Sequence, residues 1–197
     1  MRQRLSTFGS LAIVAALLVP AGTALAQDAS PTVEATLAPA AQVFAEAFPD
    51  EVGGVALADL IEVASADAPD VMDAETLPIL EKVTMGLGVG LDAVLVGQAA
   101  TFTDLFAEDE DGVWIIAIQI PGMDPATGSD LMLSLFTASG EEDLVITEAE
   151  VAERSVTRVA SADDPEAAFN IYAVADIAWL IATSSTDLLE ETISKLP

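Results

Sequence analysis

The chain has 197 residues, and 52% of them are hydrophobic, which is enough for one domain with a substantial core. It carries 33 acidic and 6 basic residues, a formal net charge of −27, and neither cysteine nor histidine. These counts exclude thiol nucleophiles, disulfides, Ser-His-Asp triads and Cys/His zinc sites. They also argue against nucleic acid as a partner, because nucleic-acid-binding domains carry a basic surface.

The amino-terminal segment has the pattern of a secretory signal peptide. Arg2 and Arg4 give a positive start, Leu11–Val19 is apolar, and Ala24-Leu25-Ala26 is a small-x-small cleavage site. The apolar stretch is shorter than the roughly 20 residues that cross a bilayer as a helix. We therefore expect residues 1–26 to be removed on export. The mature protein would lie in the secreted, periplasmic or cell-surface space, without a membrane anchor.

Two regions are expected in the mature chain. Residues 27–43 are rich in alanine, threonine and proline without a sustained period, which predicts a flexible lead-in. Residues 44–197 contain regular apolar patterns and are expected to form a single α+β domain.

The first half of this domain is predicted to hold three strands and a helix. Val55–Ser65 is predicted to be a strand with an irregularity, and a helix is expected from Leu77, with Thr76 as its cap. Asp92–Phe102 and Val113–Ile120 are the next two strands, joined by a hairpin. The second of them is apolar throughout, which is typical of a central strand buried on both faces.

The second half is predicted to be strand-rich between two helices. Asp124-Pro125 starts a helix, and Asp187 with Glu190 resembles a capping box for the last one. Polar breaks at Ala152-Glu153 and Ala175-Asp176 predict two hairpins. The four strands that these breaks separate are Leu144–Val151, Ser155–Ala160, Phe169–Val174 and Ile177–Thr183.

The succession of strands predicts an α+β fold with a mainly antiparallel sheet and about three helices on one face. The first six elements follow the order β-α-β-β-α-β, which is the order of a ferredoxin-like unit. The segment Phe48-Pro49-Asp50-Glu51-Val52-Gly53-Gly54 resembles one found in small, uncharacterised secreted bacterial proteins. That resemblance carries over no activity or site.

The densest acidic run, Glu108-Asp109-Glu110-Asp111, is a candidate divalent-metal site, with calcium as the ion that carboxylate oxygens favour. If Gly112 were the sixth residue of an EF-hand loop, Ala107 and Ile118 would stand at the first and twelfth positions, which need oxygen ligands. The run therefore has two interpretations, a weak non-EF calcium site and a solvated turn, and the second is favoured. No other cofactor is expected.

Arg154 and Arg158 are the second candidate site. They lie four residues apart in a predicted strand, so both side chains point to one face. They could bind an anionic ligand or a carboxyl-bearing partner. The abundance of acids favours the alternative, in which they pair with Glu148, Glu150 or Glu153.

Two classes of function follow from these patterns. The favoured one is a non-enzymatic extracytoplasmic binding or interaction module with a protein or small-molecule partner. The alternative is a hydrolase that uses paired carboxylates, with or without a divalent metal. Acids that converge in a buried pocket would favour the hydrolase, whereas a filled core with acids spread over the surface would favour the binding module.

Overall fold

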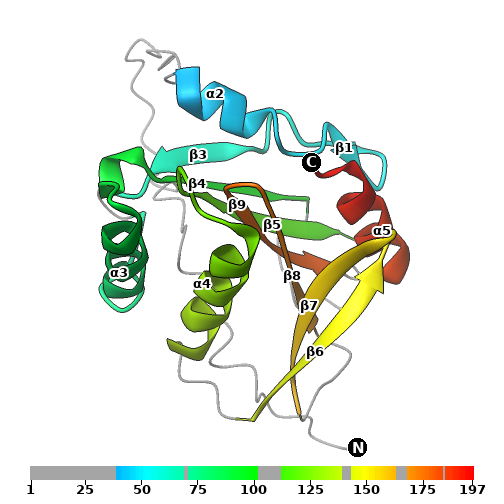
Figure 1. Ribbon diagram of the computed structural model, residues 1–197. Helices are drawn as coiled ribbons and strands as arrows, with labels where there is room; N and C mark the ends of the chain where they lie inside the picture. Colours follow the sequence, from blue (N-terminus) through cyan, green and yellow to red (C-terminus); the bar gives the residue numbers. More distant parts are fainter. Residues whose placement is uncertain (1–38, 69–70, 102–111, 139–142, 163–167, 184) are drawn as a thin grey trace, which may run out of the picture.

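The computed structural model describes residues 39–68, 71–101, 112–138, 143–162, 168–183 and 185–197. Its centre is a seven-stranded sheet in the order β3-β4-β5-β9-β8-β7-β6, in which every neighbouring pair is antiparallel (Figure 1). A two-stranded hairpin, β1-β2, lies beside it. No helix among the described residues is long and apolar enough to cross a membrane.

The helices are α2 (Pro39–Ala45), α3 (Leu77–Leu87), α4 (Pro125–Ala138) and α5 (Thr186–Lys195), with a short 3-10 turn, η2 (Leu91–Ala93). The strands are β1 (Glu51–Val52), β2 (Val55–Ala56), β3 (Glu62–Ser65), β4 (Leu95–Ala100), β5 (Val113–Gln119), β6 (Leu144–Val151), β7 (Arg154–Ser161), β8 (Ala168–Val174) and β9 (Ile177–Thr183).

The chain builds the sheet from both edges towards the middle. Strands β3, β4 and β5 run inward from one edge, and α4 then leads to β6 at the opposite edge. Strands β6 to β9 return inward, so that β9 pairs with β5, with Ala117 opposite Trp179. The centre of the sheet therefore depends on contacts between the two halves of the sequence.

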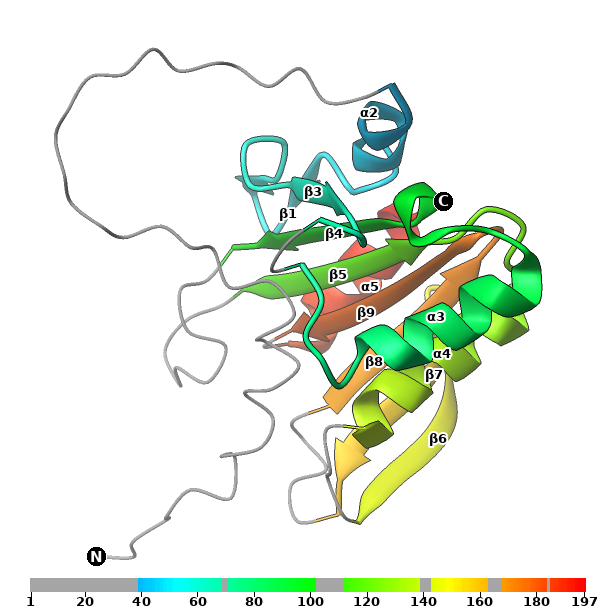
Figure 2. The same cartoon turned by 90° about the vertical axis from the view of Figure 1, so that its left-hand side faces the viewer.

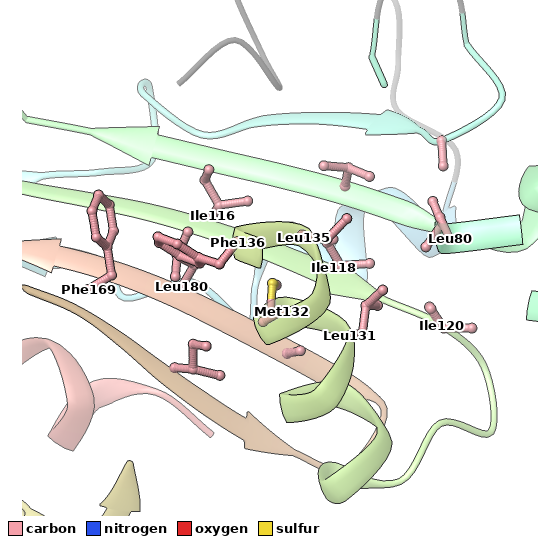
Figure 3. Packing of buried hydrophobic residues seen from close by; sticks show 14 of the residues in the cluster. Leu80, Ile116, Ile118, Ile120, Leu131, Met132, Leu135, Phe136, Phe169 and Leu180 are labelled. Carbon is pink, nitrogen blue, oxygen red and sulfur yellow. The ribbon is translucent and has the colours of Figure 1, made fainter. Parts of the chain in front are cut away.

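Helices cover both faces of this sheet (Figure 2). On one face α3 and α4 pack against β5, β8 and β9, and Figure 3 shows Leu131 and Leu135 of α4 beside Ile118 of β5. On the other face lie α2, the β1-β2 hairpin and α5, around the fully buried Trp179. The molecule thus has three layers.

The predicted α+β class with a mainly antiparallel sheet is confirmed, but the placement of the helices on one face is wrong. The reason lies in β5 and β9, in which residues 113–118 and 177–182 are all buried. Strands that are apolar on both sides need a layer on each face, and α5 with α2 supplies the second one.

The ferredoxin-like arrangement is also wrong, although the order of the first six elements of the large sheet agrees with it. In a split β-α-β unit, the two strands that a helix joins are separated by another strand. Here α3 joins β3 and β4, which are direct antiparallel neighbours. The predicted strand over Val55–Ser65 is interrupted, because Leu57 turns into the core and separates β2 from β3.

Each predicted helix forms, and the three predicted caps have different outcomes. Asp124 caps α4, its Oδ1 accepting from the backbone N–H groups of residues 126 and 127 at 3.0 Å. Thr76 stands at the N-cap position of α3, as predicted, but its side chain makes no capping hydrogen bond. Its N–H and its hydroxyl donate to Asp73 Oδ1, at 2.7 and 2.9 Å, in the turn before the helix. The cap of α5 is Ser185, two residues before the expected Asp187.

The hairpins predicted at Ala152-Glu153 and Ala175-Asp176 are confirmed as β6-β7 and β8-β9. Their turns place Ala152, Glu153 and Ala175 at positive φ, as tight two-residue turns between twisted strands require. The predicted signal peptide and residues 27–38 lie outside the described residues, and residues 39–43 form most of α2.

Candidate functional site

A polar hollow of about 150 Å³ lies on the α5 face of the sheet, where β7, β8 and β9 meet the start of α5. We call it the Arg158 hollow. Its wall is mostly polar and is formed by Arg158, Ala168, Asn170, Thr183, Ser185, Thr186 and Leu189. One of the two arginines predicted as ligand-binding residues therefore lines a recess in the surface.

The strand register places Arg158 beside Asn170, its direct partner across the β7-β8 ladder. Their neighbours Val159 and Phe169 belong to the core on the other face, so alternation turns Arg158 and Asn170 towards α5. Asn170 is only 4% exposed and lines the hollow. A largely buried amide thus lies beside a guanidinium in the wall of the hollow.

The start of α5 forms the opposite wall of the hollow. Ser185 Oγ accepts a hydrogen bond from the Leu188 N–H at 3.3 Å, and the Thr183 hydroxyl donates to the Ser185 carbonyl at 2.9 Å. The first N–H groups of an α-helix have no partner within the helix and carry the positive end of its dipole. The hollow therefore combines a guanidinium, an amide, hydroxyls and a helix N-terminus.

Arg154 lies on the same face of β7, as predicted, but at the other end of α5. Its Nη1 donates to the backbone oxygens of Leu196 at 2.8 Å and Pro197 at 2.6 Å. It also donates to the Tyr172 hydroxyl at 3.1 Å. The two arginines therefore do not form a joint site: Arg154 fixes the chain after α5, while Arg158 lines the hollow before it.

The favoured interpretation of Arg154, an ion pair with a nearby glutamate, is wrong for the described residues. Glu148 lies opposite Thr157 in the β6-β7 ladder and so faces the other side of the sheet. Its carboxylate accepts from the hydroxyls of Thr157 at 3.1 Å and Ser155 at 3.3 Å. Spacing along the sequence suggested these pairs, whereas strand alternation places Glu148 and Glu150 on the face of the sheet opposite to Arg154.

The acidic run Glu108-Asp109-Glu110-Asp111 lies outside the described residues, so the calcium site stays a prediction. Within the described part of the chain, no three acidic side chains are grouped so that they could hold a metal ion.

Two exposed carboxyls have lowered pKa values, and each acts in the structure of the fold. A hydrogen bond from the Thr127 side chain lowers the pKa of Asp124 at the start of α4. A hydrogen bond from Lys195 lowers the pKa of Glu191, which also accepts from the Gly53 N–H. A carboxylic general acid needs a raised pKa, so neither group has the property of one.

The segment Phe48–Gly54, on which the resemblance depends, has a structural role. The Phe48 ring packs edge-on against Trp179 with 5.0 Å between ring centroids. Lys195 Nζ donates to the Glu51 carbonyl at 2.8 Å, and the Gly53 N–H points at Glu191. The segment thus joins α5 to the edge of the second core.

Asn170, Thr183, Ser185 and Thr186 were not identified from the sequence. The sequence offered one sign that Asn170 could belong to a site, because it is the single amide side chain in the otherwise largely apolar strand Ala-Phe-Asn-Ile-Tyr-Ala-Val. The hydroxyl residues precede a helix and have the pattern of an ordinary cap. Their meeting with Arg158 depends on the docking of α5 across the sheet, which no local pattern encodes.

The fold and the hollow together define an α+β domain with a small, donor-rich recess beside a helix N-terminus. No family model, no curated protein and no solved structure matches the chain.

Proposed function

We propose that the protein is a non-enzymatic binding domain that is exported from the cytoplasm and holds a small ligand in the Arg158 hollow. The observation that supports this proposal is the composition of the hollow. Its polar lining residues are Arg158, Asn170, Thr183, Ser185 and Thr186, all of which can donate hydrogen bonds.

This composition favours binding over catalysis. A few convergent polar groups in a recess fix the orientation of a ligand. A hydroxyl nucleophile, in contrast, needs an adjacent base, and none of the seven described lining residues is an aspartate, glutamate or lysine. The chain has no histidine or cysteine to take that part.

The predicted export signal and the net charge bear on the cellular location of the protein and on the kind of partner it can bind. The signal-peptide pattern of residues 1–26 supports a location outside the cytoplasm. A formal net charge of −27 repels nucleic acid and anionic membrane surfaces. A small ligand of low charge approaches such a surface at a lower electrostatic cost than a polyanion does.

A thermal-shift screen of the purified protein tests the proposal. Amino acids, short carboxylic acids, sugars and divalent cations form the panel. A ligand at a hundredfold excess over Kd stabilises the folded state by about 2.7 kcal/mol, which raises the Tm of a chain of this length by roughly 5–10 °C. A panel without any such shift, or turnover of a panel compound, would contradict the proposal.

A further inference from the structure

We infer that the outer edge of β6 is a docking site for an extended segment of a partner protein, which adds an antiparallel strand to the sheet and carries lysine or arginine beside Glu148 and Glu150. The inference goes beyond the proposed function, because none of the described residues that line the Arg158 hollow belongs to β6.

Strand β6 ends the large sheet, and no described strand pairs with its outer edge (Figure 1). It has eight residues, and its pairing with β7 runs without interruption from Leu144 to Val151. The strand at the opposite edge, β3, has only four residues and lies against α2. Natural edge strands are commonly short, covered or broken by a proline or a bulge, because an open edge pairs with other chains. β6 thus has the length and regularity of a strand that can accept a partner.

The backbone groups of alternate residues of β6 point away from the sheet. The Ala162 N–H donates to the Asp143 carbonyl at 3.0 Å, in the same register as the β6-β7 ladder. In an antiparallel pair, hydrogen-bonded and non-hydrogen-bonded positions alternate, so the odd-numbered residues of β6 bond to β7. The outward N–H and C=O groups belong to the even-numbered residues Leu144, Ile146, Glu148 and Glu150. An added strand would pair with these four residues.

Two exposed apolar side chains indicate that a strand, and not a helix on one face, covers this edge. Val145 and Ile146 are 44% and 48% exposed, and as neighbours in a strand they point to opposite faces of the sheet. A helix packed on one face could cover only one of them. A strand paired with β6 places side chains beside both, since its own residues alternate between the same two faces.

The charge at the edge specifies the kind of strand. Glu148 and Glu150 are exposed and, being two residues apart, lie on one face of β6. Opposite charges across a strand pair stabilise a sheet, whereas like charges destabilise it. A second copy of the chain would bring the same two glutamates to the edge, together with a formal net charge of −27. The occupant is therefore a cationic segment of another protein.

A seven-residue peptide of alternating lysine and valine tests the inference by NMR with the purified protein. Paired antiparallel to β6, its lysines lie on the face of Glu148 and Glu150 and point their N–H groups at β6, while the valine N–H groups point away. We expect saturable binding that protects the amide hydrogens of Ile146, Glu148 and Glu150 from exchange with solvent. The amide of Thr147, which the register directs at β7, should change little.

Two N-methylated forms of this peptide separate strand pairing from simple charge attraction, because both keep every lysine charge. Methylation of the lysine backbone nitrogens removes the donors that face β6 and should weaken binding at least about tenfold. Methylation of the valine backbone nitrogens should leave the affinity within about twofold. A peptide of alternating glutamate and valine should bind at least about tenfold more weakly than the lysine peptide.

Two variants with the same change of charge locate the site. Glu150→Lys reverses a charge at the edge and should weaken binding of the lysine peptide about fivefold. Glu81→Lys makes the same change at an exposed position on α3 and should leave the affinity within about twofold. Ile146→Pro removes one outward N–H without removing a bond to β7, and should also weaken binding. The amide spectra show whether each variant is folded, and Glu150→Lys decides if Ile146→Pro is not.

Retained binding by the lysine-methylated peptide would overturn the strand pairing, and equal binding of the glutamate peptide would overturn the cationic partner. Protection of the same amides at rising protein concentration, without peptide, would make a second copy the occupant and overturn the inference. Absence of saturable binding of the lysine peptide, or equal effects of Glu150→Lys and Glu81→Lys, would overturn it as well. None of these results bears on the Arg158 hollow, whose function the thermal-shift screen tests separately.

Discussion

The guanidinium of Arg154 lies 5.3 Å from the centroid of the Tyr172 ring, and its Nη1 donates a hydrogen bond to the Tyr172 hydroxyl. The Tyr172 hydroxyl in turn donates to the Pro197 backbone oxygen at 3.0 Å, which Arg154 also reaches. The chain that follows α5 is thereby bonded to two strands of the sheet. Arg154 thus positions the helix whose other end forms the Arg158 hollow.

Arg154→Ala is expected to lower the free energy of unfolding by about 2–3 kcal/mol, because hydrogen bonds from a charged donor are lost together with the packing on Tyr172. Tyr172→Phe, the matched control, removes the hydroxyl alone and should cost about 1 kcal/mol. Urea denaturation of the three proteins measures both differences. A loss below about 0.5 kcal/mol for Arg154→Ala would mean that these contacts add no stability.

Gly97 lies beneath two aromatic rings, and Gly97→Ala is expected to destabilise the fold by about 1–3 kcal/mol through overpacking. A Cβ at this position would stand 2.9 Å from ring atoms of both Phe44 and Phe48. Gly86→Ala is the control, since nothing lies within 4 Å of its added Cβ in α3. It should stabilise the helix by about 0.5–1 kcal/mol. Thermal unfolding that moves both variants in the same direction would contradict the steric account.

Local sequence patterns correctly predicted the features that depend on interactions between residues close together in the chain. The hairpins at Ala152-Glu153 and Ala175-Asp176 and the cap at Asp124 rest on turn and cap chemistry within a few residues, and the structure confirms them. The pairing of β5 with β9 joins segments about 60 residues apart. No local pattern specifies that pairing, which is why the order of the sheet was missed. The second helix layer, in contrast, follows from the apolar run of Val113–Ile120, which already indicated a strand buried on both faces.

In the candidate site, too, local spacing was predictable from the sequence and tertiary packing was not. The spacing of Arg154 and Arg158 correctly predicted that they share a face of one strand. It could not show that α5 lies between them, with Leu196 near one arginine and Thr186 near the other. The different surroundings of the two arginines therefore arise from tertiary packing.

Gly53→Ala is expected to be more destabilising than Gly54→Ala, although both residues have positive φ, at 60° and 78°. The backbone strain of about 1 kcal/mol is common to the two positions. A Cβ on Gly53 would in addition stand 2.9 Å from Leu188 Cδ2 of α5, whereas nothing lies within 4 Å of one on Gly54. Denaturant titration should give an excess loss of about 1 kcal/mol for Gly53→Ala. Equal losses would show that α5 adjusts without cost.

Asp124→Asn is expected to change the pH dependence of stability while it keeps the cap, because asparagine is an equally good N-cap. The hydrogen bond from Thr127 lowers the pKa of Asp124 from its ordinary value of 3.8. A carboxyl with a lowered pKa in the folded state adds stability above its unfolded pKa, and the contribution disappears as the pH falls through the folded value. The Tm of the wild-type protein should therefore exceed that of the variant at about pH 6, and the two should converge at about pH 2.5. A constant difference over that range would rule out the charge as its cause.

The acidic surface predicts that sodium chloride stabilises the protein. Its formal net charge of −27 repels itself in the compact state. The Debye length falls from about 30 Å at 0.01 M salt to about 3 Å at 1 M, so added salt screens that repulsion. We expect the Tm to rise over this range, with most of the increase below about 0.1 M, where the screening length falls fastest. Replacement of sodium chloride by sucrose is the control, because sucrose stabilises by exclusion from the surface without screening charge and gives no steep initial rise. A Tm that does not change with salt would mean that the acidic groups are spaced widely enough to leave the folded state without net electrostatic strain.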